Sequence, residues 1–160
     1  MGKVQQTFLN GCPGAVSRSV DDIIISVKNA GETDIPFGAP VFLYAGENAV
    51  KPFDASASTS ANFVGFTVRV PDKTPETYGS STGIWNADDP VEVLVRGSVV
   101  LYFENNVSPG ASVYVRKADG KLVVNPGAEG STVLLPGVTV RTGRDTARCA
   151  EVVLTKRNVI

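Results

Sequence analysis

Short runs of alternating apolar and polar residues recur along this chain of 160 residues, and glycine or proline residues punctuate the intervals between them. Alternation with a period of two is typical of a β-strand that buries one face. No segment has the period of about 3.6 residues that an amphipathic helix needs. We therefore predict an all-β, single-domain fold, an antiparallel β-barrel or β-sandwich of short strands. The expected strands are residues 23–27, 41–44, 63–70, 91–96, 99–103, 112–116, 122–124, 132–135, 138–142 and 149–154.

The stretch SVYVRKADGKLVVNPG, residues 112–127, illustrates the pattern. Val113 and Val115 point to one face of a strand, and the polar residues between them point to the other. Asp119 and Gly120 tolerate the positive φ angles of a tight turn, and the chain then returns as a second strand. This stretch predicts a β-hairpin.

Charge and length exclude several classes of partner. The chain has 15 basic and 16 acidic residues, a net charge of −1, so bulk electrostatics favours neither nucleic acid nor an anionic membrane. The first residues lack the apolar run of a secretory signal, and no stretch has the roughly 20 apolar residues of a membrane span. We expect synthesis in a cytoplasm and a partner that is recognised by shape and local contacts.

The residue types argue against catalysis. The chain contains no histidine, which removes the most common general base, the Ser-His-Asp and Cys-His arrangements and most zinc sites. Residues 79–83, GSSTG, match a nucleophile-elbow pattern but lack a histidine partner and a strand-to-helix setting. The adjacent acids Asp21-Asp22 and Asp88-Asp89 favour turns and strand ends over a catalytic pair. We predict neither an enzyme nor a metal or cofactor site.

The two cysteines, Cys12 and Cys149, lie near opposite ends of the chain. Because the sequence has no export signal, we expect two reduced thiols rather than a disulfide.

Residues 98–103, SVVLYF, are apolar on both faces of the expected strand. In an antiparallel fold such a strand needs a second cover, which is either another part of the chain or a neighbouring subunit. An uncovered strand of this kind would promote aggregation. We therefore expect a homo-oligomer, with Val100 and Tyr102 as contact residues.

Residues 71–90 form a long expected loop that carries Tyr78 and the only tryptophan, Trp85. Loops of this length are usually functional or disordered. Two interpretations of Trp85 are equally supported: the ring packs as a plug on its own barrel, or it anchors a partner.

Residues 1–20 are expected to form an extended N-terminal arm, followed by a β-rich domain over residues 21–160. The arm has few apolar residues for a core strand and too much glycine and proline for a helix. Phe8 and Leu9 are candidates to fill an apolar groove on another surface, and Arg18 is a candidate to pair with an acidic group there.

Several blocks resemble one known family. In order along the chain they are GCPGAVSRSVDDIIISVKNAG, DIPFGAPV, FVGFTVR, VEVLVRGSVVL and VSPGASVYVRKADGKLV. This order resembles the structural cement, or decoration, proteins of tailed bacteriophage capsids, from about Gly11 onward. The GxPG turn before an arginine and the IPFGxPV block are its most specific motifs.

The resemblance implies a small β-rich protein, made in the host cytoplasm, that binds the outer surface of an icosahedral capsid in the virion. It would clamp neighbouring subunits of the major capsid protein without a catalytic step. A trimer, favoured over a dimer, is likewise implied only by the resemblance. The expected capsid contacts are Phe8, Leu9, Arg18, Tyr78 and Trp85.

Two alternatives stay open from the sequence. A carbohydrate-binding domain of a virion fibre or adhesin would also be β-rich and would present exposed aromatic residues beside Asp and Asn, for which Tyr78, Trp85, Asn86 and Asp88 are a partial match. An enzyme would need a Ser-Lys or carboxylate site that sequence motifs do not reveal.

Overall fold

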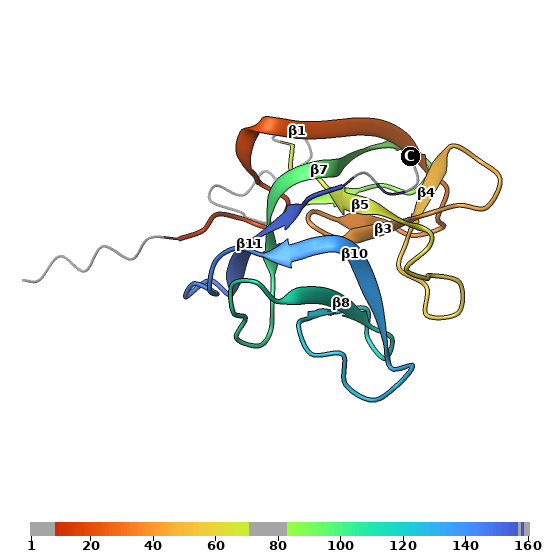
Figure 1. Ribbon diagram of the computed structural model, residues 1–160. Helices are drawn as coiled ribbons and strands as arrows, with labels where there is room; N and C mark the ends of the chain where they lie inside the picture. Colours follow the sequence, from red (N-terminus) through yellow and green to blue (C-terminus); the bar gives the residue numbers. More distant parts are fainter. Residues whose placement is uncertain (1–8, 71–82, 157, 159–160) are drawn as a thin grey trace, which may run out of the picture.

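The computed structural model describes residues 9–70, 83–156 and 158. Strands dominate this part of the chain, and none of the described residues forms a helix (Figure 1). The strands are β1 (Val16–Asn29), β2 (Ile35–Pro36), β3 (Pro40–Leu43), β4 (Ala49–Pro52), β5 (Phe63–Thr67), β6 (Ile84–Trp85), β7 (Pro90–Tyr102), β8 (Ser112–Arg116), β9 (Leu122–Val123), β10 (Thr132–Val140) and β11 (Cys149–Leu154). The prediction of an all-β fold is confirmed.

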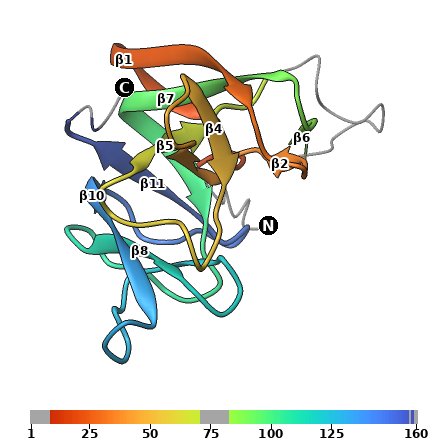
Figure 2. The same ribbon diagram turned by 90° about the vertical axis from the view of Figure 1, so that its right-hand side faces the viewer.

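The first half of the fold is a small closed barrel. Its strands follow the order β1-β4-β3-β5-β7, and β7 closes the ring because it also pairs with β1. In both views of the molecule β1 runs along β7 (Figures 1 and 2). One pairing differs from the antiparallel prediction: β1 and β4 are parallel at Lys28↔Ala49 and Asn29↔Val50. The β3–β4 hairpin turns the chain back, so that β4 arrives beside β1 in the same direction.

The second half extends the sheet from the far end of β7. Residues 97–102 of β7 pair with β11, and β10, β8 and β9 follow in that order, all antiparallel. Figure 2 shows this extension below the barrel. The predicted hairpin is present as β8 and β9, and Gly120 has the expected positive φ of 71°.

β7 is one strand of 13 residues where the sequence suggested two, 91–96 and 99–103. Gly97, with φ of 123°, lies at the junction. Before it, Val93 and Val95 face the barrel interior; after it, Val99 and Leu101 face the extension. A glycine at a β-bulge changes the direction of the strand, so that one strand can contribute side chains to two separate cores.

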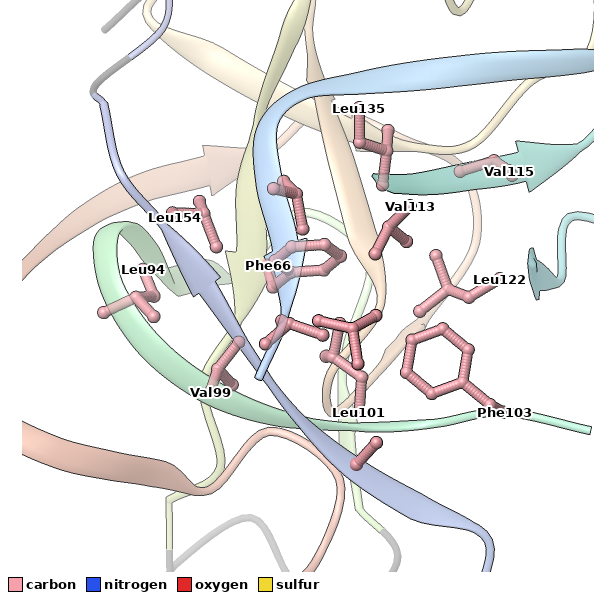
Figure 3. Packing of buried hydrophobic residues seen from close by; sticks show 14 of the residues in the cluster. Phe66, Leu94, Val99, Leu101, Phe103, Val113, Val115, Leu122, Leu135 and Leu154 are labelled. Carbon is pink, nitrogen blue, oxygen red and sulfur yellow. The ribbon is translucent and has the colours of Figure 1, made fainter. Parts of the chain in front are cut away.

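Two clusters of buried residues result. One, inside the barrel, contains Val27, Ile35, Phe37, Val41, Val50, Val64, Trp85, Val91, Val93 and Val95. The other, between the barrel and the extension, is shown in part in Figure 3. It contains Phe42, Phe63, Phe66, Val68, Leu94, Val99, Leu101, Phe103, Val107, Val113, Val115, Leu122, Leu135, Val138, Val140, Ala150, Val152 and Leu154.

Some element boundaries differ from the sequence-based ones. β11 has the predicted bounds, and the strands expected at 132–135 and 138–142 are joined in β10, whose register shifts between Leu134 and Thr139. Three short strands, β2, β4 and β6, were not predicted, and β6 lies within the stretch 71–90 that was expected to be a loop.

β1 begins at Val16, so its first residues fall within the stretch expected to be an extended arm. The register of β1 against β7 shifts three times between Val16 and Ile24. These irregularities break the period of two, which explains why the sequence pattern located only residues 23–27 as strand. The described residues contain no helix long and apolar enough to span a membrane.

Candidate functional site

Residues 9–18, which we call the N-terminal strap, lie across the second half of β7. The Gly14 N–H donates to the carbonyl oxygen of Val100 at 2.9 Å, and the Val100 N–H donates to the carbonyl oxygen of Ala15 at 2.9 Å. The Arg69 N–H donates to the Gly14 carbonyl at 2.8 Å. The strap is therefore hydrogen-bonded to both β7 and the residues that follow β5.

The strap supplies the second cover that the SVVLYF segment needs. A Cβ atom built on Gly11 would lie 3.3 Å from Cγ2 of Val100, so the strap backbone packs directly on this side chain. Val100 is only 1% exposed as a result. The chain's own N-terminal segment is therefore one cover of this strand, and Val100 offers little surface for the contact with another copy that the sequence predicted. Tyr102 remains 44% exposed.

Asn10 fastens the beginning of the strap. Its backbone N–H donates to Oδ2 of Asp145 at 2.7 Å. Its side-chain amide donates to the carbonyl oxygens of Gly143 at 3.0 Å and Cys149 at 2.8 Å. Asn10 thus donates three hydrogen bonds, to three different residues, and these fix the strap beside Cys149, the first residue of β11. Leu9, the residue before, is 58% exposed.

Arg18 fastens the other end of the strap. Its Nε lies 2.8 Å from Oε1 of Glu151 on β11, and Arg141 Nε is 3.9 Å from the same oxygen. The Glu151 side chain is only 10% exposed, so Arg18 neutralises a largely buried carboxylate. The acidic partner expected on another surface is present within this chain.

Trp85 belongs to the barrel interior. The residue is 5% exposed, its Nε1 donates to the carbonyl oxygen of Val68 at 3.1 Å, and its ring centroid is 6.2 Å from that of Phe37 in an edge-to-face arrangement. This is the core-plug interpretation. Because the Trp85 ring is buried, it is not an exposed aromatic residue of the kind that the carbohydrate-binding alternative needs. It also has little exposed surface for a capsid contact. Phe8 and Tyr78 lie outside the described residues.

A group of exposed apolar side chains on β1 was not predicted. Val20 is 100% exposed, Ile24 is 43% exposed and Ile23 is 36% exposed. We call these three residues the β1 patch. Beyond β7, the described pairings of β1 involve only Lys28 and Asn29 with β4, so most of the outer edge of the strand has no neighbour among the described strands. The isoleucine run at residues 23–25 was the only signal, and it was assigned to the expected half-buried strand 23–27.

Charged residues surround the β1 patch. Arg96 Nη2 lies 2.8 Å from Oδ2 of Asp21. Asp22 packs against the bulge at Gly97, and its Oδ1 is buried without a hydrogen-bond partner among the described residues. Burial raises the pKa of Asp22; a backbone hydrogen bond from Ser98 opposes this shift and the neighbouring Asp21 adds to it.

A groove of about 460 Å³ separates residues 36–40 from the β8–β9 hairpin. Its walls are mostly apolar, and a charged group lies on the hairpin side, where Lys121 pairs with Glu104 and Arg116 pairs with Asp119. The hydrogen bond from Arg116 lowers the pKa of Asp119 to about 2. The described residues contain no group of three or more acidic, cysteine or histidine side chains that could hold a metal ion.

The chain is similar to known proteins in both sequence and fold. A family model described as "Structural cement protein (E217 gp24/Pam3 gp6)" matches residues 3–155. A chain from the structure entitled "The capsid of Myoviridae Phage XM1" is similar in fold, with a TM-score of 0.73 and 18% sequence identity over 97% of this chain and 96% of that chain. A search of curated proteins finds no match.

Proposed function

Because the chain belongs to the family of phage structural cement proteins, we propose that it binds the outer surface of a bacteriophage capsid and stabilises contacts between neighbouring subunits of the major capsid protein. The observation that carries this proposal is the family match over residues 3–155, nearly the whole chain. The fold similarity to a chain of a phage capsid structure supports it at the level of architecture.

The chemistry of the described residues suits a structural role. A cement protein needs a rigid scaffold and an exposed contact surface, and it needs no reacting group. Two buried clusters on a shared strand supply the scaffold. When many copies bind at equivalent positions on a shell, their individually small contacts sum to a large total stabilisation of the shell. The protein acts without catalysis, resides in the virion after synthesis in the host cytoplasm, and contacts protein rather than nucleic acid or membrane.

The β1 patch is the contact surface that we favour for the capsid. Val20 extends fully into solvent, and burying a valine side chain contributes roughly 1.5 kcal/mol or more. Leu9 adds a further exposed apolar side chain at the start of the strap. Phe8 and Tyr78 remain proposed contacts on the strength of their sequence positions alone.

The test is to mix the purified protein with expanded capsids that lack it, and to measure bound copies and the temperature at which the capsids disrupt. Saturable binding with a rise in that temperature supports the proposal, and failure to bind refutes it.

Val20→Asp should weaken binding about tenfold or more, since it loses apolar contact and desolvates a charge. Leu134→Asp is the matched control, because Leu134 on β10 is 41% exposed and lies outside the patch. Equal losses in both variants would exclude the β1 patch as the specific contact.

Self-association, as a trimer before a dimer, is part of the proposal. Tyr102 remains the candidate contact because it is 44% exposed and accepts a hydrogen bond from Arg148 Nη1 at 3.3 Å. Sedimentation equilibrium should show a trimer that Tyr102→Ala weakens. Tyr44→Ala is the control, because Tyr44 is 38% exposed on the barrel. A wild-type protein that stays monomeric at high concentration, with no contact between copies on the shell, would contradict the trimer.

A further inference from the structure

Cys149 lies on the face of the sheet that the strap covers. Along β11, Ala150 and Val152 belong to the core between the barrel and the extension. Side chains alternate along a strand, so Cys149 and Glu151 point to the opposite face. Glu151 meets Arg18 of the strap on that face at 2.8 Å.

The strap brings Cys12 to the same place. Two residues before Cys12, the Asn10 amide donates to the carbonyl oxygen of Cys149 at 2.8 Å. Gly11, between them, packs on Val100, which pairs with Glu151 in the β7–β11 ladder. The chain from residue 10 to residue 12 therefore passes over the end of β11 where Cys149 begins the strand.

Cys12 is also among the neighbours that influence the ionisation of the Cys149 thiol. Burial raises the pKa of the Cys149 thiol to about 11, and the neighbouring Asp145 and Cys12 contribute further in that direction. Both thiols are free in the structure; Cys149 is buried and Cys12 is half-buried. The chain has 2 cysteines, so these are the only possible partners within one molecule.

We propose that Cys12 and Cys149 form a redox-controlled clamp, in which oxidation by a small-molecule disulfide fixes the N-terminal strap covalently to β11. In a reducing cytoplasm the thiols stay free, and the strap is held without a covalent link by hydrogen bonds, by packing of Gly11 on Val100 and by the Arg18–Glu151 ion pair. In an oxidising medium outside the cell the clamp closes.

The reaction is a thiol–disulfide exchange in two steps. The Cys12 thiolate attacks one sulfur of the small-molecule disulfide, forms a mixed disulfide and expels one small thiolate. Cys149 then loses its proton to solvent, and its thiolate attacks the Cys12 sulfur and expels the second small thiolate. Two protein thiols are oxidised while the reagent disulfide is reduced to two thiols.

The consequence is a stabilised strap. The disulfide would close a loop that runs from residue 12 to residue 149, and long cross-linked loops remove much conformational freedom from the unfolded chain. We expect the melting temperature to rise by about 5 °C or more on oxidation. Closure from the mixed disulfide should accelerate about tenfold per pH unit between roughly pH 7 and 9, since the second step needs the Cys149 thiolate.

The experiment treats the full-length protein with oxidised glutathione, blocks remaining thiols with iodoacetamide and measures the intact mass and the disulfide-linked peptides. The expected product is a monomer with no free thiol, a Cys12–Cys149 peptide and a raised melting temperature that dithiothreitol reverses. Cys12→Ser should abolish both the link and the thermal shift. Cys149→Ser and Cys149→Ala provide the second control. If either variant fails to fold, the intact mass of the oxidised wild-type protein still decides whether the intramolecular disulfide forms.

Three outcomes would overturn the clamp. A glutathione adduct that persists on Cys12 would show that the thiols do not meet. Disulfide-linked dimers as the main product would show that Cys12 meets another molecule first. An intramolecular link without thermal stabilisation would show that it distorts the native strap.

Discussion

Nε of Arg18 lies 2.8 Å from Oε1 of Glu151, an ion pair between the first and the last strand of the fold. Because the Glu151 carboxylate is only 10% exposed, it depends on this partner for neutralisation. Arg141 is at the edge of contact, 3.9 Å away. The strap is thus an integral part of the folded domain. The sequence had instead suggested an arm, separate from the β-rich domain, over residues 1–20.

Arg18→Ala should lower the free energy of unfolding by about 1–2 kcal/mol, because it leaves a nearly buried carboxylate with a distant partner. The estimate lies below the 3–5 kcal/mol typical of fully buried pairs, since the Arg18 side chain is itself 62% exposed. Urea unfolding monitored by Trp85 fluorescence measures the change. Arg96→Ala is the control, since its pair with Asp21 is exposed on both sides and should contribute less than about 1 kcal/mol. Equal effects in the two variants would contradict the special role of Arg18.

Gly97→Ala should destabilise the protein by about 3 kcal/mol or more. The new Cβ would lie 2.1 Å from Oδ1 of Asp22 and 3.1 Å from its Cα, and the φ of 123° is unfavourable for alanine. Gly110→Ala is a matched control: its φ is also positive, at 89°, but nothing lies within 4 Å, so it should lose only about 1 kcal/mol. Thermal and urea unfolding of the two variants separate the steric effect from the backbone effect.

Asp22→Asn should stabilise the protein at neutral pH and have little effect in acid. Burial raises the pKa of Asp22 above its usual value of 3.8, so the folded state favours the protonated acid. The stability that this group contributes is complete below pH 3.8 and is lost as the pH rises through the folded-state pKa. We expect a gain of about 1–3 °C in melting temperature at pH 7 that disappears near pH 3. A gain of equal size at both pH values would point to a cause other than ionisation.

The sequence predicted the elements whose alternation is regular and missed those that depend on distant contacts. β8 follows from the period of two, and β9 follows from the turn at Asp119 and Gly120 that completes the hairpin. β2 and β6 have two residues each and exist because Ile35 and Trp85 meet in the barrel core, which no local pattern encodes.

The same limit applies to the candidate site. The apolar character of residues 98–103 indicated that this strand needs a second cover. The sequence did not show that the N-terminal strap provides it, because register shifts interrupt the alternation in β1 and glycines interrupt it in the strap. The exposure of Val20 depends on the irregular register of β1, so a regular alternation could not predict it.

Two N-terminal truncations should separate the strap from the residues before it. Deleting residues 2–8 leaves every contact of the strap described above in place, so the unfolding free energy should change by less than about 0.5 kcal/mol. Deleting residues 2–12 also removes the three hydrogen bonds of Asn10 and the cover of Gly11 over Val100. That loss should reduce the unfolding free energy by about 3 kcal/mol and expose apolar surface on β7. Urea unfolding and binding of a hydrophobic dye measure the two effects. If the longer deletion is as stable as the shorter one, the strap does not stabilise the domain. If the shorter deletion alone abolishes capsid binding without loss of stability, residues 2–8 contribute directly to the capsid contact.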